Sequence, residues 1–138
     1  MDFTGRQKNQ KGTSTLELVV VLPSLLFILF GIIEFSRAWL TVNIVTTASR
    51  EGARTGSVTP PLPGDVFDSA PAEARIDQIL TAANLSTGVI RSVTCPQPCV
   101  TGSQVQADVQ VTFDTLLPII LPMLADIDIN RSTTMRFE

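Results

Sequence analysis

The residues that could do chemistry lie close to the N-terminus, where Glu17 follows Gly12 by five positions at the start of an apolar run. A carboxylate just inside an apolar helix is costly and is a functional candidate by default. If a peptidase cut the chain between Gly12 and Thr13, Thr13 would gain a free α-amino group, which is positively charged at neutral pH. The amine of one copy would then neutralise Glu17 of a neighbouring copy inside a bundle of apolar helices. The simpler alternative is that Glu17 extends to the lipid headgroups.

The residue types that most catalytic sites need are missing from the sequence. The chain of 138 residues contains no His, so neither a Ser-His-Asp set nor a Cys-His pair can form. No glycine-rich phosphate loop occurs. Asp126 and Asp128 are a close pair of carboxylates in a strand-like segment, where solvated edge residues are more common than catalysts. A net charge of −3 argues against binding to nucleic acid. We therefore expect no enzyme activity, no metal and no cofactor.

Two cysteines, Cys95 and Cys99, form a C-P-Q-P-C segment. This spacing differs from the C-x-x-C of redox motifs, and a zinc site would need two more ligands that the sequence does not offer. Outside the cytoplasm the two thiols are expected to be oxidised. The segment therefore predicts a structural disulfide in the hairpin between Thr94 and Gln104.

One stretch of the chain is apolar enough to cross a membrane. Residues 18–33 carry no charge and would span about 24 Å as a helix, and extension to Leu16 and Trp39 gives a transmembrane segment of about 16–39. Phe35 and Trp39 would anchor the far end at the headgroups. Arg6, Lys8 and Lys11 precede the segment, which places the N-terminus in the cytoplasm and the rest outside. A cleaved signal peptide is the alternative.

The helix is expected to continue to residue 56, so that it has a transmembrane and an extracytoplasmic half. Pro23 lies inside it, either as an incidental kink or as a point where the helix could stretch. Arg50, Glu51 and Arg54 lie on its outer half. They would form either an intramolecular ion pair on a solvated face or a docking patch for the carboxylates of another subunit. Gly56 is expected to end the helix.

The remaining residues predict a small α+β head. Residues 57–71 form a proline-rich linker, with Asp68 or Ser69 as a helix cap, and residues 72–138 form the head. A helix from about Pro71 would bury its apolar face, and residues 104–113 alternate as a half-buried strand, with weaker strands at 89–94 and 127–137. The apolar segment 116–124 would cover the core or face a membrane or partner. The fold class is α+β, a pilin-like lollipop with one long N-terminal helix, one head helix and a three-stranded antiparallel sheet. The apolar face of the expected head helix, which starts near Pro71, is formed by Ile76, Ile79, Leu80 and Ala83.

Residues 11–54 resemble the TadE-like pseudopilins of tight-adherence (Tad) type IVc pilus systems. The matching motifs are Lys11-Gly12 with Glu17 five positions on, Leu22-Pro23, Glu34-Phe35-Ser36-Arg37 and Arg50-Glu51-Gly52-Ala53-Arg54. The resemblance implies that residues 1–12 are a basic leader removed by a prepilin peptidase. Gly12 would then be the cleavage site, Thr13 the mature N-terminus and Glu17 the assembly residue. Glu34, Arg37, Arg50, Glu51 and Arg54 become candidates for contacts between subunits.

The resulting functional hypothesis is a pilin-like structural subunit, a minor pseudopilin that enters or primes a Tad-type pilus for adhesion or surface attachment. Its expected partners are the prepilin peptidase, other pilin-like subunits, the inner-membrane assembly platform and membrane lipid. It would lie in the cytoplasmic (inner) membrane as a single-pass protein with the head outside, and outside the cell once assembled. The alternatives are the major repeating subunit of a filament and an unprocessed single-span anchor whose head binds a pilus or secretion partner.

Overall fold

The computed structural model describes residues 10–85, 88–115 and 126–138. The elements in chain order are α1 (Gln10–Val58), α2 (Ala70–Ala82), β1 (Val89–Thr94), β2 (Gln104–Asp114) and β3 (Asp126–Arg136). They confirm the expected α+β class, with one long N-terminal helix, one further helix and a three-stranded antiparallel sheet. The chain divides into two compact units, Met1–Arg37 and Ala38–Glu138, which we call the N-terminal and C-terminal units.

In the N-terminal unit, α1 is apolar on all sides. Its large side chains from Leu16 to Ile33 are largely exposed, and none of its most apolar stretch of 18 residues is buried. It is the one helix in the described part of the chain that is long and apolar enough to cross a membrane. A helix that is hydrophobic all round needs lipid or other helices around it.

Pro23 lies inside α1 without ending it. Because proline has no backbone N–H, it cannot donate to the carbonyl of Val19, one turn earlier. The next residue adds a local contact, since the hydroxyl of Ser24 donates to the carbonyl of Val21 at 2.7 Å. A carbonyl that loses its helical donor, as that of Val19 does, is tolerated in apolar surroundings where a neighbouring donor can satisfy it.

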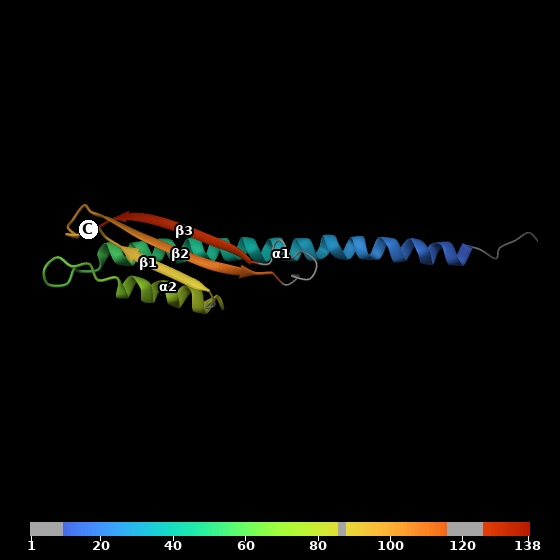
Figure 1. Ribbon diagram of the computed structural model, residues 1–138, viewed down its shortest axis with the longest axis horizontal. Coiled ribbons are helices and arrows are strands. Elements are labelled where there is room, and N and C mark those ends of the chain that lie inside the picture. Colours follow the sequence, from blue (N-terminus) through green and yellow to red (C-terminus); the bar gives the residue numbers. More distant parts are fainter. Residues whose placement is uncertain (1–9, 86–87, 116–125) are drawn as a thin grey trace, which may run out of the picture. The chain divides into compact units, whose positions relative to one another are not determined.

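The C-terminal unit is built on a sheet in the order β1-β2-β3, with both pairs antiparallel. Figure 1 shows α2 and the three strands beside the C-terminal half of α1. The predicted alternation of the central strand is confirmed, because every second residue of β2 is buried on the helix side. These buried residues are Val105, Ala107, Val109, Val111 and Phe113.

The side of α1 that meets the sheet consists mainly of small residues. A Cβ added at Gly52 would lie 2.5 Å from Cδ1 of Ile76 on α2, so only glycine allows this close approach. Gly56 lies against Val105 and Phe67. It is inside α1, which ends at Val58, so the expected helix end at Gly56 is wrong. The buried positions follow the spacing of one helix face: Thr41, Val45, Ala48, Ser49, Gly52, Ala53, Gly56 and Ser57.

A hydrogen-bonded serine fixes α1 on the sheet. The buried hydroxyl of Ser49 donates to the carbonyl of Ala107 at 3.2 Å and shares a hydrogen bond of 2.6 Å with the hydroxyl of Thr133. These contacts connect α1 to both β2 and β3. A buried polar group needs such partners, since an unmatched one would destabilise the unit.

Helix α2 covers the β1 side of the sheet. It buries Ala72, Ile76 and Leu80, and its Asp77 forms an ion pair of 2.8 Å with Arg91 of β1. At its start, the Asp68 carboxylate accepts a hydrogen bond from the backbone N–H of Ala70. The side chain of Ser69, at the N-cap, makes no capping hydrogen bond.

The predicted disulfide between Cys95 and Cys99 is present, with the two Cα atoms 5.8 Å apart. Both cysteines are buried, and the N–H of Cys99 donates to the carbonyl of Asp65 at 3.3 Å. The β1–β2 connection is therefore held to the segment between the two helices. The apolar segment 116–124 lies outside the described residues.

Candidate assembly site

The proposed processing and assembly residues all lie in the first turns of α1. Gly12 and Thr13 are inside the helix, and Glu17 is one turn beyond Thr13 on the same helix face, with an exposed side chain. The rise between Thr13 and Glu17 is about 6 Å. A free amine at Thr13 would therefore lie near Glu17 of its own chain. It would also lie at the N-terminal end of the helix, where Glu17 of a neighbouring copy could reach it.

The surface around Glu17 is suited to contact with other apolar helices or lipid. The exposed side chains on either side of it, Leu16, Leu18, Val19 and Val20, are all aliphatic. Glu17 is the one ionisable residue between Thr15 and Ile33, because the next charge along the helix is Glu34. An isolated carboxylate in such a surface is expensive in lipid unless a cation pairs with it.

Glu34 and Arg37 pair with each other inside the N-terminal unit. Nη1 of Arg37 lies 3.1 Å from Oε2 of Glu34, and 17% of the Glu34 side chain is exposed. The pair neutralises both charges at i,i+3 spacing within one copy. The structure thus pairs the two residues within one copy. Their contact with other subunits stays a proposal.

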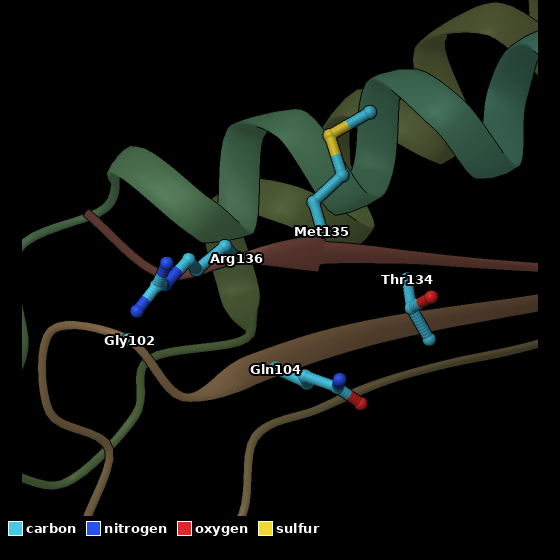
Figure 2. Close-up of a pocket in the computed structure, with 5 residues that line it drawn as sticks. All are labelled: Gly102, Gln104, Thr134, Met135 and Arg136. Carbon is cyan, nitrogen blue, oxygen red and sulfur yellow. The ribbon is translucent and has the colours of Figure 1, made fainter.

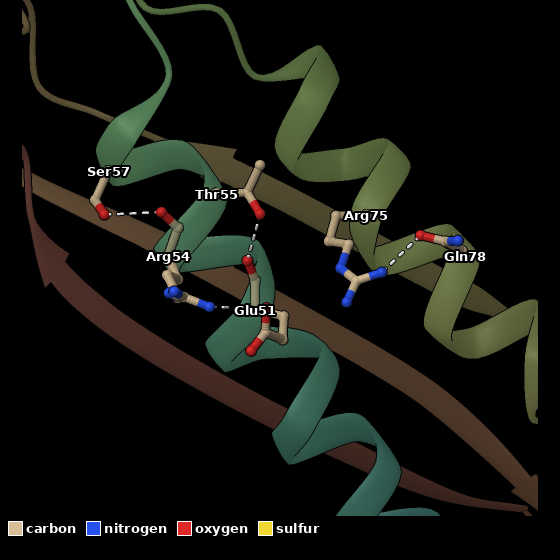
Figure 3. Close-up of polar contacts among 6 residues, drawn as sticks. All are labelled: Glu51, Arg54, Thr55, Ser57, Arg75 and Gln78. Carbon is tan, nitrogen blue, oxygen red and sulfur yellow. Dashed lines mark hydrogen bonds and ion pairs between the residues drawn. The ribbon is translucent and has the colours of Figure 1, made fainter.

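The segment 50–54 divides its residues between the outside and the core. Figure 3 shows Glu51 and Arg54 on α1, with Nη1 of Arg54 3.9 Å from Oε2 of Glu51. The Arg54 side chain is 72% exposed, so this pair contributes little stability. Arg50 is exposed and forms no ion pair with any residue that the structure describes. Gly52 and Ala53, by contrast, are buried.

The packing role of Gly52 and Ala53 was missed by reasoning from the sequence, which attended only to the charged members of the segment. The signal was the four-residue spacing of Ala48, Gly52 and Gly56 on one helix face, which is typical of a close approach between elements. The glycine and alanine position the helix on the sheet and α2. The two arginines then project from the opposite side.

Two hollows lie on the surface of the C-terminal unit. One, of about 320 Å³, lies between α1 and α2 and has a mainly apolar lining. The other, of about 310 Å³, lies at the end of the sheet around Arg136, and Figure 2 shows Met135 directed toward the helix while Gln104 and Thr134 point away. The residues that line the first are Asn43, Ile44, Thr47, Ile79, Ala82 and Ala83.

Acidic side chains do not gather into a metal site in the part of the chain that the structure describes. The carboxylate of Asp128 accepts a hydrogen bond from the hydroxyl of Thr112 at 2.9 Å, on the exposed face of the sheet. The contact fits a solvated strand residue.

Comparison with known proteins bears on the N-terminal part of the chain. The family model described as TadE-like protein matches residues 12–54. No curated protein and no solved structure matches the chain. The matched range contains Gly12, Glu17 and the whole 50–54 segment, and it supports a pilin-like subunit associated with a Tad pilus system. The long helix, from Gly12 to Arg54, is therefore TadE-like, as the resemblance predicts.

Proposed function

We propose that this chain is a structural rather than a catalytic protein, a minor pseudopilin that enters or primes a Tad-type pilus through its N-terminal helix. One observation carries the proposal: α1 exposes an apolar surface that is interrupted only by Glu17 between Thr15 and Ile33. Lipid covers such a surface before assembly, and the helices of other subunits cover it in a filament. In this proposal the head serves adhesion or surface attachment.

Processing converts the membrane-inserted form into the assembling form. A prepilin peptidase cuts between Gly12 and Thr13 and removes the basic leader, which carries Arg6, Lys8 and Lys11. These charges hold the N-terminus in the cytoplasm, and the head lies outside the inner membrane. After the cut, the chain joins other pilin-like subunits at the inner-membrane assembly platform.

The new amine at Thr13 pairs with Glu17 of an adjacent subunit. Inside a bundle of helices the two charges neutralise each other, and neither is left unpaired in apolar surroundings. Pairing with Glu17 of the same chain is the competing arrangement, because the helix places the two residues one turn apart. Only the pairing between copies makes assembly depend on the carboxylate.

The decisive experiment replaces Glu17 by Gln, which keeps the size of the side chain and removes its charge. We expect Glu17→Gln to lower the number of surface pili at least about tenfold, whereas Glu17→Asp, which keeps the charge, retains most of them. The mass of the membrane-purified protein, measured intact, should correspond to a chain that starts at Thr13. Wild-type pili from Glu17→Gln, or a chain that still starts at Met1 in piliated cells, would contradict the proposal.

A second candidate function is an unprocessed single-span anchor whose head binds a pilus or secretion partner. The exposed apolar surface of α1 fits it, since lipid alone can cover that surface, but a lone anchor leaves the carboxylate of Glu17 without a cation from a neighbouring subunit. The two functions differ at Gly12: Gly12→Val blocks cleavage and abolishes assembly of a pseudopilin but leaves an anchor working.

A further inference from the structure

The outward face of the sheet is polar except for one residue. Ile90 of β1 lies opposite Gln110 of β2 in the register and is 64% exposed. It is the one apolar side chain that the described strands β1, β2 and β3 present on this face. Its neighbours on β2 and β3 are polar or acidic, among them Gln106, Asp108, Asp128, Asn130 and Ser132.

The helix side of the same unit carries a matching hollow. Ile44 of α1 and Ile79, Ala82 and Ala83 of α2 form the apolar part of its wall, and its volume of about 320 Å³ has room for one branched aliphatic side chain. Asn43 and Thr47 face away from the sheet, so the hollow opens on the side opposite to Ile90.

The charges on the two sides are complementary. Arg50 and Arg54 project from α1 on the side away from the sheet, and Figure 3 shows Arg54 and Arg75 on neighbouring helices in front of the sheet. Three carboxylates lie on the same two helices, Glu51, Glu73 and Asp77, but all three are half-buried, and Asp77 pairs with Arg91 of β1. The exposed charges of the two helices around the hollow are therefore the three arginines.

The sheet side is acidic around its apolar side chain. Asp108 lies two residues from Gln110 along β2, and Asp128 lies across from Thr112 on β3. At about 3.3 Å per residue and 4.8 Å between strands, both carboxylates lie within about 12 Å of Ile90. On the helix side, Arg75 lies one turn, about 6 Å, from Ile79 along α2.

We propose that Ile90 of one copy inserts into the hollow between α1 and α2 of the next copy, with its surrounding carboxylates near Arg50, Arg54 and Arg75. The occupant of the hollow is a second copy of this chain. Because the two surfaces lie on opposite sides of the unit, the contact joins two different surfaces, head to tail, and does not close as a two-fold dimer. The inference rests on the proposed function and specifies which surfaces of the C-terminal units meet during assembly.

Cross-linking between two tagged forms of the full-length chain tests this contact. One form carries Gln110→Cys, beside Ile90, and the other carries Thr47→Cys, at the wall of the hollow; both are expressed together in the membrane. The native cysteines do not react, since they form the disulfide. A short bismaleimide should yield the mixed dimer. Arg131→Cys, an exposed position on the edge strand β3, replaces Gln110→Cys as the control and should yield none.

A matched pair of variants then tests the role of the isoleucine. Burial of one exposed isoleucine changes an association constant by about ten- to a hundredfold. We therefore expect Ile90→Ser to lower the mixed dimer at least about tenfold. Val100→Ser removes an apolar side chain of 48% exposure from the β1–β2 connection and should leave the yield unchanged. Both side chains are exposed, so circular dichroism should report the same fold.

Equal yields of mixed dimer from Ile90→Ser and Val100→Ser would overturn the contact. So would a mixed dimer from Arg131→Cys in the same yield as from Gln110→Cys. Absence of the mixed dimer with Gln110→Cys would overturn it as well. The last result would also follow if a related subunit, rather than a second copy, filled the hollow. Pilus counts for Glu17→Gln, measured in parallel, separate the two proposals. If Glu17→Gln loses its pili while the cysteine variants with native Glu17 give no cross-link, the head-to-tail contact is wrong and the proposed function is kept.

Discussion

Single residues of the segment 50–54 divide two tasks between opposite sides of one helix. Gly52 and Ala53 face the core and let α2 and the sheet approach α1, whereas Arg50 and Arg54 extend into solvent. A motif with charged ends and a small centre is thus explained without assigning all its members to one site. The arginines affect contacts with partners, and the small residues affect the stability of the unit.

Gly52→Val should lower the free energy of unfolding of the C-terminal unit by about 1–3 kcal/mol. Ile76, whose Cδ1 would lie 2.5 Å from the new Cβ, is fully buried and has little space to move, so the added atoms overpack the core. Thermal unfolding followed by circular dichroism, in detergent, measures the loss. Thr47→Val, at an exposed position of the same helix, serves as the control.

A double-mutant cycle ties this effect to one contact. In a chain with Ile76→Ala the clash is gone, so Gly52→Val should then cost less than it does in the unmodified chain. An equal loss in both backgrounds, or a loss with Thr47→Val as large as with Gly52→Val, would show that the close approach is not responsible.

The elements with one buried face were predictable from the sequence. Strand β2 alternates without interruption because one face meets the helices and the other meets solvent. Strand β3 is interrupted at Arg131, which stands opposite Val109 on the helix side. The arginine is tolerated there because β3 is an edge strand, its side chain is exposed, and its Nη1 donates to the carbonyl of Asn130 at 3.2 Å.

The surfaces that depend on how elements pack were not predictable in this way. The hollow lies between α1 and α2 around Ile44 and Ile79, and periodicity along either helix does not define the space between them. In the sequence alone, Ile90 is simply one apolar residue of a weakly patterned strand. Only the register with Gln110 places it on the polar face.

The β1–β2 connection should lose stability when its disulfide is removed. Closing a loop of five residues contributes roughly 2 kcal/mol in the chain-entropy model, so the variant with Cys95→Ala and Cys99→Ala should unfold at lower denaturant concentration. Alanine avoids burying a new hydroxyl at two buried positions. Denaturation of the unmodified chain with and without a reductant provides the comparison, and identical midpoints would refute the stabilising role.

The molecule combines a unit that packs a core with a helical stretch, residues 15–37, whose described side chains are mostly exposed. The core lies within Ala38–Glu138 and includes Val45, Ala48 and Ala53 from α1. Residues up to Arg37 bury no part of their most apolar stretch. One helix therefore serves as a surface for membrane or partner subunits in its first half and as a core element in its second.

This division predicts where the chain can be shortened. A chain of residues 38–138 keeps every residue of the core, so it should be soluble and unfold cooperatively, with the far-ultraviolet circular dichroism of a mixed α+β domain. A chain of residues 60–138 loses the side of α1 that covers β2 and β3, including the hydrogen bonds of Ser49 to Ala107 and Thr133. The exposed face of β2 would then carry Val105, Val109 and Val111, which favours aggregation over folding. If residues 60–138 unfolded at the same temperature as residues 38–138, the second half of α1 would be an attachment to the head rather than part of its core.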